Sequence, residues 1–324
     1  MEQPGEFYIK TPLIRSERLS KKLGVTVWLK LENIQNSHSF KMRGISNLCK
    51  KAAEKGCSKF VSSSGGNAGA AATYCARLLN KPIMVIVPES TPAVVVKNLE
   101  DGGADAIVFG KVWDEANKKA LEIVSSTPGA QYVSPFDDPL IWEGNSTMIE
   151  EIKEQLHGNV PDAIVVAVGG GGLLCGVCQG LHKVGWGHVP VVAMETAGCD
   201  SLNCCIRDNK WSQLNDITSA AKCLGARRVC HQAYQWLSQH NIISCVVDDQ
   251  QAASACLQFA DDHHMMVELS CGAALAAAYG DKLEQLQCDD SSQLSWTSGN
   301  LVLVVCGGSG VNVDMLLKWK NNLL

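Results

Sequence analysis

The chain has 324 residues, of which 46% are hydrophobic and 19% are charged, and its formal net charge at pH 7 is −5. This length allows one large domain or two medium ones, and the acidic balance argues against nucleic-acid or anionic-membrane surfaces, which need clustered Lys and Arg. No apolar run reaches the roughly 18 residues that a transmembrane helix requires, and the N-terminal stretch lacks the apolar core of a signal peptide. We therefore expect a cytoplasmic protein that binds neither nucleic acid nor membranes.

The fifteen cysteines are scattered through apolar stretches, and an odd number cannot all pair within one chain. We expect them to be buried and reduced. Cys175 and Cys178 have the spacing of a metal or redox motif, but no second pair accompanies them. The adjacent Cys204 and Cys205 have no His at ligand spacing, so a zinc site is not expected.

Short β-branched runs alternate with helical patterns along nearly the whole chain. The predicted strands are, in chain order, residues 25–31, 59–63, 82–88, 104–109, 162–168, 189–194 and 300–306. Most are continuously apolar, as expected of strands that helices cover on both faces. Apolar residues at the spacing of one helix face predict helices such as 41–54 and 271–286. The pattern predicts an α/β fold with mainly parallel sheets.

The predicted strands fall into two clusters, which predicts two domains, each an open sheet flanked by helices. We assign residues 35–138 to a small domain. Residues 1–34 fit either cluster by pattern, and we group them with 139–324 in a large domain.

A run of four glycines follows the predicted strand 162–168, in the sequence VGGGGLLCG. Glycines let backbone N–H groups approach an anion, and the helix that follows offers its positive N-terminus. A phosphate is the expected ligand, with a tight turn that binds nothing as the alternative. The run is not a nucleotide motif, because no Gly-Lys-Ser/Thr follows and Leu174 or Cys175 stands where a dinucleotide fingerprint has its third glycine.

Two further glycine turns follow predicted strands. The turn 62–69, SSSGGNAG, could hold a carboxylate or a ring oxygen, although a helix N-cap uses similar residues. The turn 305–310, VCGGSG, places Cys306 at the end of the last strand, where a core cysteine is the simpler interpretation.

Lys41 begins a predicted helix between Phe40 and Met42, with Arg43 close by. Pyridoxal phosphate needs what these segments offer, because its phosphate takes an amide nest, its aldehyde takes an amine and its substrate is an amino acid. Next to Arg43 and partly desolvated by Phe40, the Lys41 amine should have a lowered pKa. A neutral amine is the form that makes a Schiff base.

Three motifs carry a resemblance to a known family: SFKMRG at 39–44, SGGNAG at 64–69 and GGGGL at 169–173. They resemble the tryptophan-synthase-β group of pyridoxal-phosphate enzymes (fold type II). The closest resemblance, over almost the whole chain, is to the animal L-serine dehydratase/L-threonine deaminase group with its serine-dehydratase-like branch. It extends to segments such as KVWDEAN and PFDDPLIWEG.

The resemblance implies a role for each matching residue. Lys41 would form the Schiff base and exchange the substrate Cα proton. Phe40 would cover one face of the ring, and Cys223, where the family usually has alanine, the other. Asn67 would bind the ring hydroxyl and Cys306 the pyridine nitrogen. The phosphate would lie on Gly169, Gly170, Gly171, Gly172 and Leu173, and the substrate carboxylate on Ser64, Gly65, Gly66 and Asn67.

The resemblance also implies a homodimer and a monovalent-cation site, for an ion such as K⁺. The implied ligands are backbone oxygens of Gly169, Cys199, Leu224 and Ala226 with the side chains of Glu195 and Ser201. A carboxylate at a helix start is the alternative role for Glu195.

Chemistry then separates the possible reactions. A thiol at the pyridine nitrogen makes a weaker electron sink than a carboxylate, which favours prompt β-elimination over transamination. The group's racemases have a serine where this chain has Gly65, and glycine cannot carry a proton. We therefore expect dehydration of L-serine to pyruvate and of L-threonine to 2-oxobutanoate, each with ammonia. A racemase, a β-replacing synthase and a weakly active cofactor-binding homologue stay open.

The chain also departs from the family pattern. Asn36 and His38 replace a proline and a glycine before Ser-Phe-Lys, and Leu269 replaces a proline. His38 could bring a titratable group near the Schiff base, although a tolerated loop change is favoured. Gly65, where the better-known dehydratase has alanine, should leave extra room near the substrate and loosen its positioning.

Overall fold

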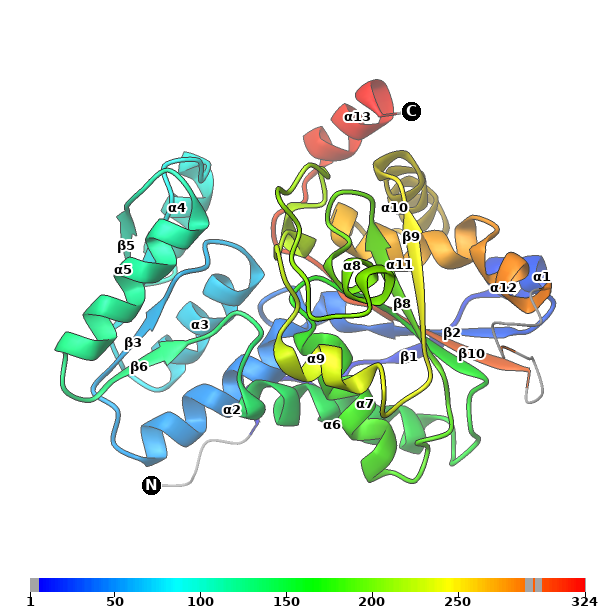
Figure 1. The fold of residues 1–324 in the computed structure, drawn as a ribbon, viewed down its shortest axis with the longest axis horizontal. Helices are drawn as coiled ribbons and strands as arrows, with labels where there is room; N and C mark the ends of the chain where they lie inside the picture. Colours follow the sequence, from blue (N-terminus) through cyan, green and yellow to red (C-terminus); the bar gives the residue numbers. More distant parts are fainter. Residues whose placement is uncertain (1–5, 289–293, 295–298, 324) are drawn as a thin grey trace.

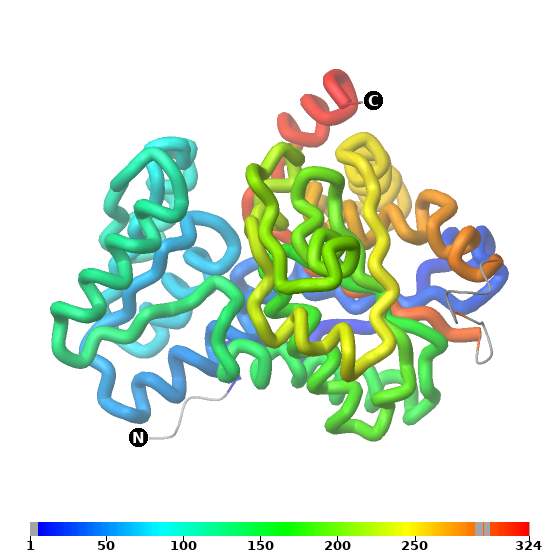
Figure 2. Tube along the Cα trace, viewed as in Figure 1, coloured from blue at the N-terminus to red at the C-terminus, as the bar shows by residue number. Residues whose placement is uncertain are grey.

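The computed structural model describes residues 6–288, 294 and 299–323. It has two separate sheets, which lie side by side in Figures 1 and 2, with helix α2 (Lys41–Glu54) below the smaller sheet and packed against both α3 and α6. Within the described residues, no helix is long and apolar enough to cross a membrane.

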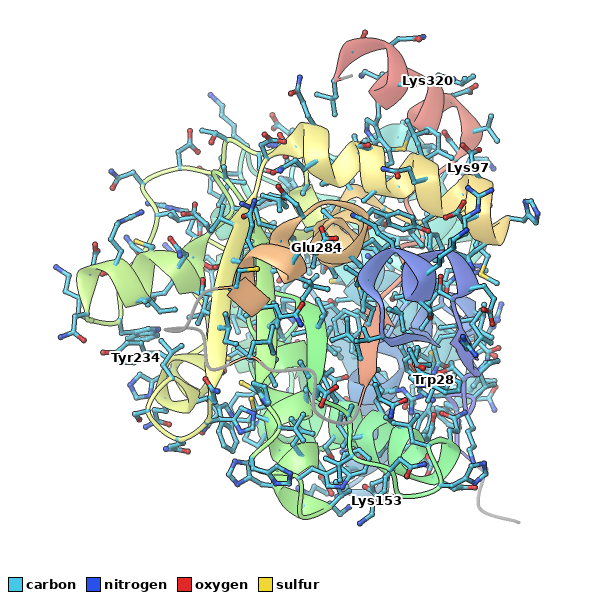
Figure 3. All side chains as sticks on the ribbon, turned by 90° about the vertical axis from the view of Figure 1, so that its right-hand side faces the viewer. Trp28, Lys97, Lys153, Tyr234, Glu284 and Lys320 are labelled. Atoms are coloured by element: carbon cyan, nitrogen blue, oxygen red, sulfur yellow. The ribbon has the colours of Figure 1, made fainter. Side chains whose placement is uncertain are left out.

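The larger sheet has six strands in the order β1-β2-β10-β7-β8-β9. The strands are β1 (Leu13–Arg15), β2 (Thr26–Leu31), β7 (Ala163–Ala167), β8 (Val191–Thr196), β9 (Ile242–Val247) and β10 (Asn300–Val305). All neighbours are parallel except β1 and β2. The indole of Trp28, labelled in Figure 3, donates a 2.9 Å hydrogen bond to Asn300 across β2 and β10.

The smaller sheet is wholly parallel, in the order β5-β4-β3-β6. Its strands are β3 (Lys59–Ser62), β4 (Ile83–Val87), β5 (Asp105–Val108) and β6 (Ala130–Val133). These strands lie inside the predicted small domain, whereas the segments on either side of it supply the larger sheet. The domain boundaries themselves stay predictions.

Helices cover both sheets. Besides α2 they are α1 (Glu17–Leu23), α3 (Asn67–Leu78), α4 (Ala93–Asp101), α5 (Trp113–Ser126), α6 (Pro139–Gln155), α7 (Gly172–Lys183), α8 (Ser201–Asp208), α9 (His231–Trp236), α10 (Asp249–His263), α11 (Leu269–Tyr279), α12 (Lys282–Cys288) and α13 (Val313–Asn322), with 3₁₀ turns η1 (Glu32–Ile34) and η2 (Lys222–Leu224). Strands β7, β8 and β10 are almost wholly buried, which agrees with their continuous apolar sequences.

The predicted α/β class and all seven predicted strands are confirmed. Strands β1, β6 and β9 are not among the predicted ones. Strand β1 has three residues, too few to show a pattern, and β6 (AQYV) has no continuous apolar run, whereas the IISCVV run of β9 is detectable. The single helix expected over 271–286 is wrong: it is two helices, because Gly280 adopts an extended conformation between them.

All fifteen cysteines are free thiols. The expected burial is confirmed for thirteen of them and is wrong for Cys223 and Cys288, which are exposed. Cys175 and Cys178 lie on α7.

Candidate active site

Lys41 is the first residue of α2, and the segment before it is joined to the loop that follows β10. The Phe40 amide donates to the Cys306 carbonyl at 3.1 Å, and the Gly308 amide donates to the His38 carbonyl at 2.8 Å. Two stretches that are far apart in the sequence therefore lie side by side, and they bring Cys306 to the start of α2.

The Lys41 amine lies inside the protein. Its Nζ donates a 2.5 Å hydrogen bond to the Pro135 carbonyl and lies 5.1 Å from the centre of the Phe40 ring. Burial lowers the pKa of Lys41 to about 8, against the opposing influence of the thiol groups of Cys223, Cys306 and Cys230. The expected lowering is confirmed, and burial is its dominant cause.

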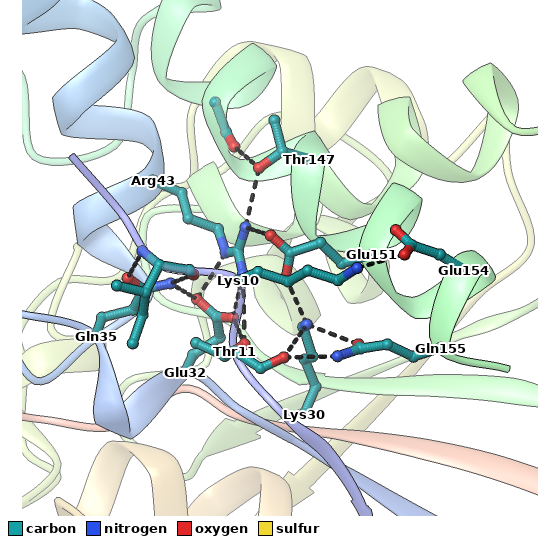
Figure 4. Close-up of polar contacts among 12 residues, drawn as sticks. Lys10, Thr11, Lys30, Glu32, Gln35, Arg43, Thr147, Glu151, Glu154 and Gln155 are labelled. Atoms are coloured by element: carbon teal, nitrogen blue, oxygen red, sulfur yellow. Dashed lines mark hydrogen bonds and ion pairs between the residues drawn. The ribbon is translucent and has the colours of Figure 1, made fainter. Parts of the chain in front are cut away.

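The sequence prediction also gives Arg43 a part in that lowering, and this part of the prediction is wrong. Residues two apart on a helix do not face each other. The Arg43 guanidinium is fully buried on the far side of α2, where it pairs with Glu32 at 2.8 Å and Glu151 at 2.7 Å (Figure 4). It therefore anchors the helix and exerts no repulsion on Lys41.

A pH profile tests the state of the amine. We expect cofactor-free protein to take up pyridoxal phosphate at a rate that rises with pH and levels off above about 8, because Lys41 is neutral there. Stopped-flow absorbance measures this rate. Lys51, which lies on the same helix and pairs with Glu143, is the control lysine in labelling by mass spectrometry. An uptake rate that still rises steeply near pH 10, where ordinary lysines titrate, would contradict the assignment.

The glycine run lies between β7 and α7. Gly171 has φ +90°, and a Cβ on Gly170 would lie 2.3 Å from the Phe136 ring. Among the hydrogen bonds of the described residues, the amides of residues 169–174 donate to no protein acceptor, although they lie at a helix N-terminus. This run of free donors fits a phosphate group.

Gly171→Ala tests whether the loop tolerates a side chain. Its Cβ would lie 2.5 Å from that of Ala233, whereas Gly185, with φ +82°, has nothing within 4 Å. Both alanine variants bear the cost of a left-handed backbone. We expect Gly171→Ala to lose about 1–3 kcal/mol more unfolding free energy than Gly185→Ala and to bind pyridoxal phosphate more weakly. Urea titration and equilibrium dialysis measure the two effects, and equal values for both variants would contradict this account.

The turn between β3 and α3 faces the same region. The Ser63 hydroxyl donates a 2.9 Å hydrogen bond to Asn117 and lies 3.0 Å from the Tyr132 hydroxyl. These contacts stabilise the start of the turn. The extra room expected at Gly65 is absent. A Cβ there would lie 2.9 Å from a Val87 methyl, so Val87 already fills that space.

Asn67 is the first residue of α3, and its amide makes contacts that the sequence did not suggest. It donates to Glu268 at 3.0 Å and accepts from the amide of Ser309 at 2.8 Å. Glu268 is buried and immediately precedes α11. The signal that could have revealed it is a lone carboxylate directly before the mainly apolar helix 269–279.

Two thiols lie close to this carboxylate. Cys223, in η2, lies 3.6 Å from the Asn67 amide nitrogen. Although the Cys223 residue is exposed, its sulfur is desolvated by the surrounding groups, and this desolvation together with the Glu268 charge raises the pKa of Cys223. A hydrogen bond with Cys271 and burial raise the pKa of Cys306. Both groups therefore stay neutral thiols at physiological pH.

His38 lies just before Lys41 and has a left-handed backbone, with φ +60°. Glycine adopts this conformation without strain, which accounts for the glycine that the family resemblance implies there. The His38 side chain is exposed, which agrees with a loop change.

Some of the residues that the family resemblance implies as ligands of a monovalent cation lie close together. Ser201 Oγ donates to the Gly169 carbonyl at 3.5 Å, and Leu224 packs against Gly169. The buried Glu195 carboxylate accepts from the amides of Leu202 and Asn203 at 2.8 Å each. Burial raises the pKa of Glu195 to about 8. These contacts are those of a carboxylate at a helix start.

The two remaining residues of the implied cation set, Cys199 and Ala226, make contacts with other residues. The Cys199 thiol donates to the Ala221 carbonyl at 3.9 Å, and the Ala226 amide donates to the Leu224 carbonyl at 2.7 Å.

A buried lysine, a nest of free amides and a thiol at a strand end define an enzyme that uses pyridoxal phosphate. The chain belongs to this class, because the family described as "Pyridoxal-phosphate dependent enzyme" matches residues 6–307.

The chain is similar to particular enzymes within this class. The chain is 47% identical over 323 residues to the L-serine dehydratase/L-threonine deaminase of Mus musculus, covering 100% of this chain and 98% of that protein. It is 48% identical over 317 residues to the serine dehydratase-like protein of Homo sapiens, covering 98% and 95%. The crystal structure of a fungal L-serine ammonia-lyase from Rhizomucor miehei superposes with a TM-score of 0.92 at 33% identity, covering 99% and 100%. The fold is thus that of fold type II pyridoxal-phosphate enzymes.

Proposed function

We propose that the protein is an ammonia-lyase that removes water from L-serine and L-threonine, releasing pyruvate or 2-oxobutanoate with ammonia. The observation that carries the proposal is Lys41, an amine whose pKa is lowered to about 8 and whose Nζ donates to the Pro135 carbonyl, with the thiols of Cys223 and Cys306 close enough to influence its charge. The names of its relatives, which include a dehydratase and an ammonia-lyase, support the same reaction.

Each part of the site would then have a distinct task. Pyridoxal phosphate, when bound, supplies the electron sink that makes the substrate Cα–H acidic. The free amides of residues 169–174 would hold the phosphate, and the amides and hydroxyl of Ser64–Asn67 would hold the substrate carboxylate. Lys41 would attach the cofactor and, once released, take the Cα proton with its neutral amine. Phe40 would lie against the ring and limit access of water.

The thiols argue for elimination over transamination. Cys306 and Cys223 stay protonated, and a thiol at the pyridine nitrogen does not donate a full proton to it. The resulting electron sink is modest, which suits rapid loss of a β-hydroxyl group. Gly65 has no side chain to exchange a proton from the opposite face, which disfavours racemisation.

The test is to incubate cofactor-loaded protein with L-serine and with L-threonine. We expect keto acid and ammonia in equal amounts. Formation of D-serine in place of pyruvate would identify a racemase, and a thioether amino acid formed only when a thiol is added would identify a β-replacing synthase. Bound cofactor without any product would favour a binding protein. Each of these three outcomes would contradict the proposed reaction.

Three further features belong to the proposal. A homodimer, a cytoplasmic location and a monovalent cation such as K⁺ near Glu195 are what the family resemblance implies, and they stay predictions. The preference between serine and threonine is open to the same assay.

A further inference from the structure

The Asn67 side chain joins the two halves of the molecule. It begins α3, which packs on the four-stranded sheet, while its partners Glu268 and Ser309 belong to the α11 start and the loop after β10. Asn67 Oδ1 accepts from the Ser309 amide at 2.8 Å and from the Ser309 hydroxyl at 2.9 Å. Asn67 Nδ2 donates to Glu268 Oε2 at 3.0 Å.

These partners leave only one orientation for the amide group. A backbone N–H can only donate, so the atom facing Ser309 must be the carbonyl oxygen of Asn67. A carboxylate accepts, so the atom facing Glu268 must be the amide nitrogen. Glu268 is itself held, because its Oε1 accepts from the Gly310 amide at 2.8 Å.

The second hydrogen of the Asn67 amide group is donated to the Cys223 sulfur, a weak acceptor, at 3.6 Å. Cys223 is close enough to Lys41 to influence its charge. This N–H therefore points toward the space beside the amine, where a stronger oxygen acceptor could replace the sulfur.

We infer that Ser309 and Glu268 are positioning residues that hold Asn67 as an oriented hydrogen-bond donor toward the ring oxygen of pyridoxal phosphate. The inference rests on the proposed function. It adds that the orientation of Asn67, and not only its presence, governs cofactor affinity.

A simpler possibility is that Asn67 only stabilises the contact between α3 and the segments that carry Glu268 and Ser309. Reversing the donor and the acceptor separates the two roles. In Asn67→Asp, a second carboxylate would face Glu268. Adding Glu268→Gln restores the contact, since the new amide oxygen can keep the Gly310 amide while the new NH₂ group donates to the introduced carboxylate. The hydrogen bond between residues 67 and 268 is then restored, but residue 67 no longer offers an N–H donor to the ring oxygen of pyridoxal phosphate.

The variants are compared by thermal unfolding of the cofactor-free chain and by equilibrium dialysis against pyridoxal phosphate. We expect the single Asn67→Asp change to lower both the unfolding midpoint and the affinity. We expect the double variant to recover most of the midpoint while its affinity stays about tenfold or more below wild type. Recovery of the affinity together with the midpoint would overturn the inference.

Milder variants guard against loss of folding. Ser309→Ala keeps the backbone donor and removes the hydroxyl, so we expect about a threefold to tenfold weaker affinity, with rescue by Ser309→Thr. Unchanged affinity in Ser309→Ala would count against its positioning role.

The chain offers a matched control. Asn47 of α2 donates to Glu143 Oε2 of α6 at 3.1 Å in an exposed contact, and also to the Leu140 carbonyl at 2.7 Å. The same reversal, Asn47→Asp with Glu143→Gln, should leave the cofactor affinity unchanged. If it weakens the affinity equally, the effect of the Asn67 pair is not local and the inference is wrong.

Borohydride reduction of wild-type protein, followed by mass spectrometry, separates this inference from the proposed function. Cofactor that is absent from Lys41 in wild type would contradict the proposed function and the inference together. Cofactor on Lys41, with affinity regained in the double variant, would contradict the inference alone.

Discussion

Replacing Lys41 by alanine should abolish borohydride-stable attachment of pyridoxal phosphate and reduce keto-acid release from L-serine by roughly 10³-fold or more. The reason is that the proposed function gives one amine two tasks, attachment of the cofactor and removal of the Cα proton. Its buried position and lowered pKa make it available for both. Mass spectrometry of the reduced protein and a keto-acid assay measure the two effects.

Lys51→Ala is the matched control for this variant. Lys51 lies on the same helix but forms an exposed ion pair with Glu143. We expect its replacement to leave both readouts unchanged. Attachment of the cofactor to any lysine other than Lys41, or full activity without Lys41, would refute the assignment.

Replacing Arg43 by methionine should lower the free energy of unfolding by about 3–5 kcal/mol, because it leaves the buried carboxylate of Glu32 without its paired cation and removes one of the two cations of Glu151. Figure 4 shows that side chains from separate segments of the chain meet around Arg43. Arg43 comes from α2, Glu32 from η1 and Glu151 from α6, and Lys30 from β2 adds a 2.6 Å bond to Glu151. Urea unfolding measures the loss.

The exposed Lys51→Met variant is the control, and we expect it to cost less than about 1 kcal/mol. Arg43→Lys should fall between the two, because an ammonium cannot form the paired contacts of a guanidinium. A loss from Arg43→Met no larger than that from Lys51→Met would show that the network adds nothing to stability.

Acid should reduce the effect of Arg43→Met. Burial by itself would raise the pKa of Glu32, but the charge and hydrogen bonds of Arg43 lower it below its usual value. Stability from a lowered carboxyl pKa is present above the unfolded-state pKa, about 4.3, and is lost as pH falls through the folded-state value. The difference between wild type and variant should therefore shrink below about pH 4. A difference that grows in acid would have the wrong sign.

Local patterns were sufficient to predict much of this site. The glycine run after β7, the turn before α3 and Lys41 at a helix start each sit where a strand or a loop meets a helix. Such junctions are encoded by a few consecutive residues, as continuous apolar runs encode the buried parallel strands. The direction of Arg43 was also readable, because side chains two residues apart on a helix point to different faces.

The sequence by itself therefore determined the fold class, the place of Lys41 at a helix start and the glycine run between a strand and a helix, since each depends on neighbours within about ten positions. Only the tertiary structure decided that Glu268 and Ser309 hold Asn67, that Val87 fills the space at Gly65, and that Arg43 joins Glu151. Asn67 and Glu268 are 201 positions apart, and Arg43 and Glu151 are 108 apart. Contacts of this kind form only when separate elements pack together, and no periodicity along the chain records them.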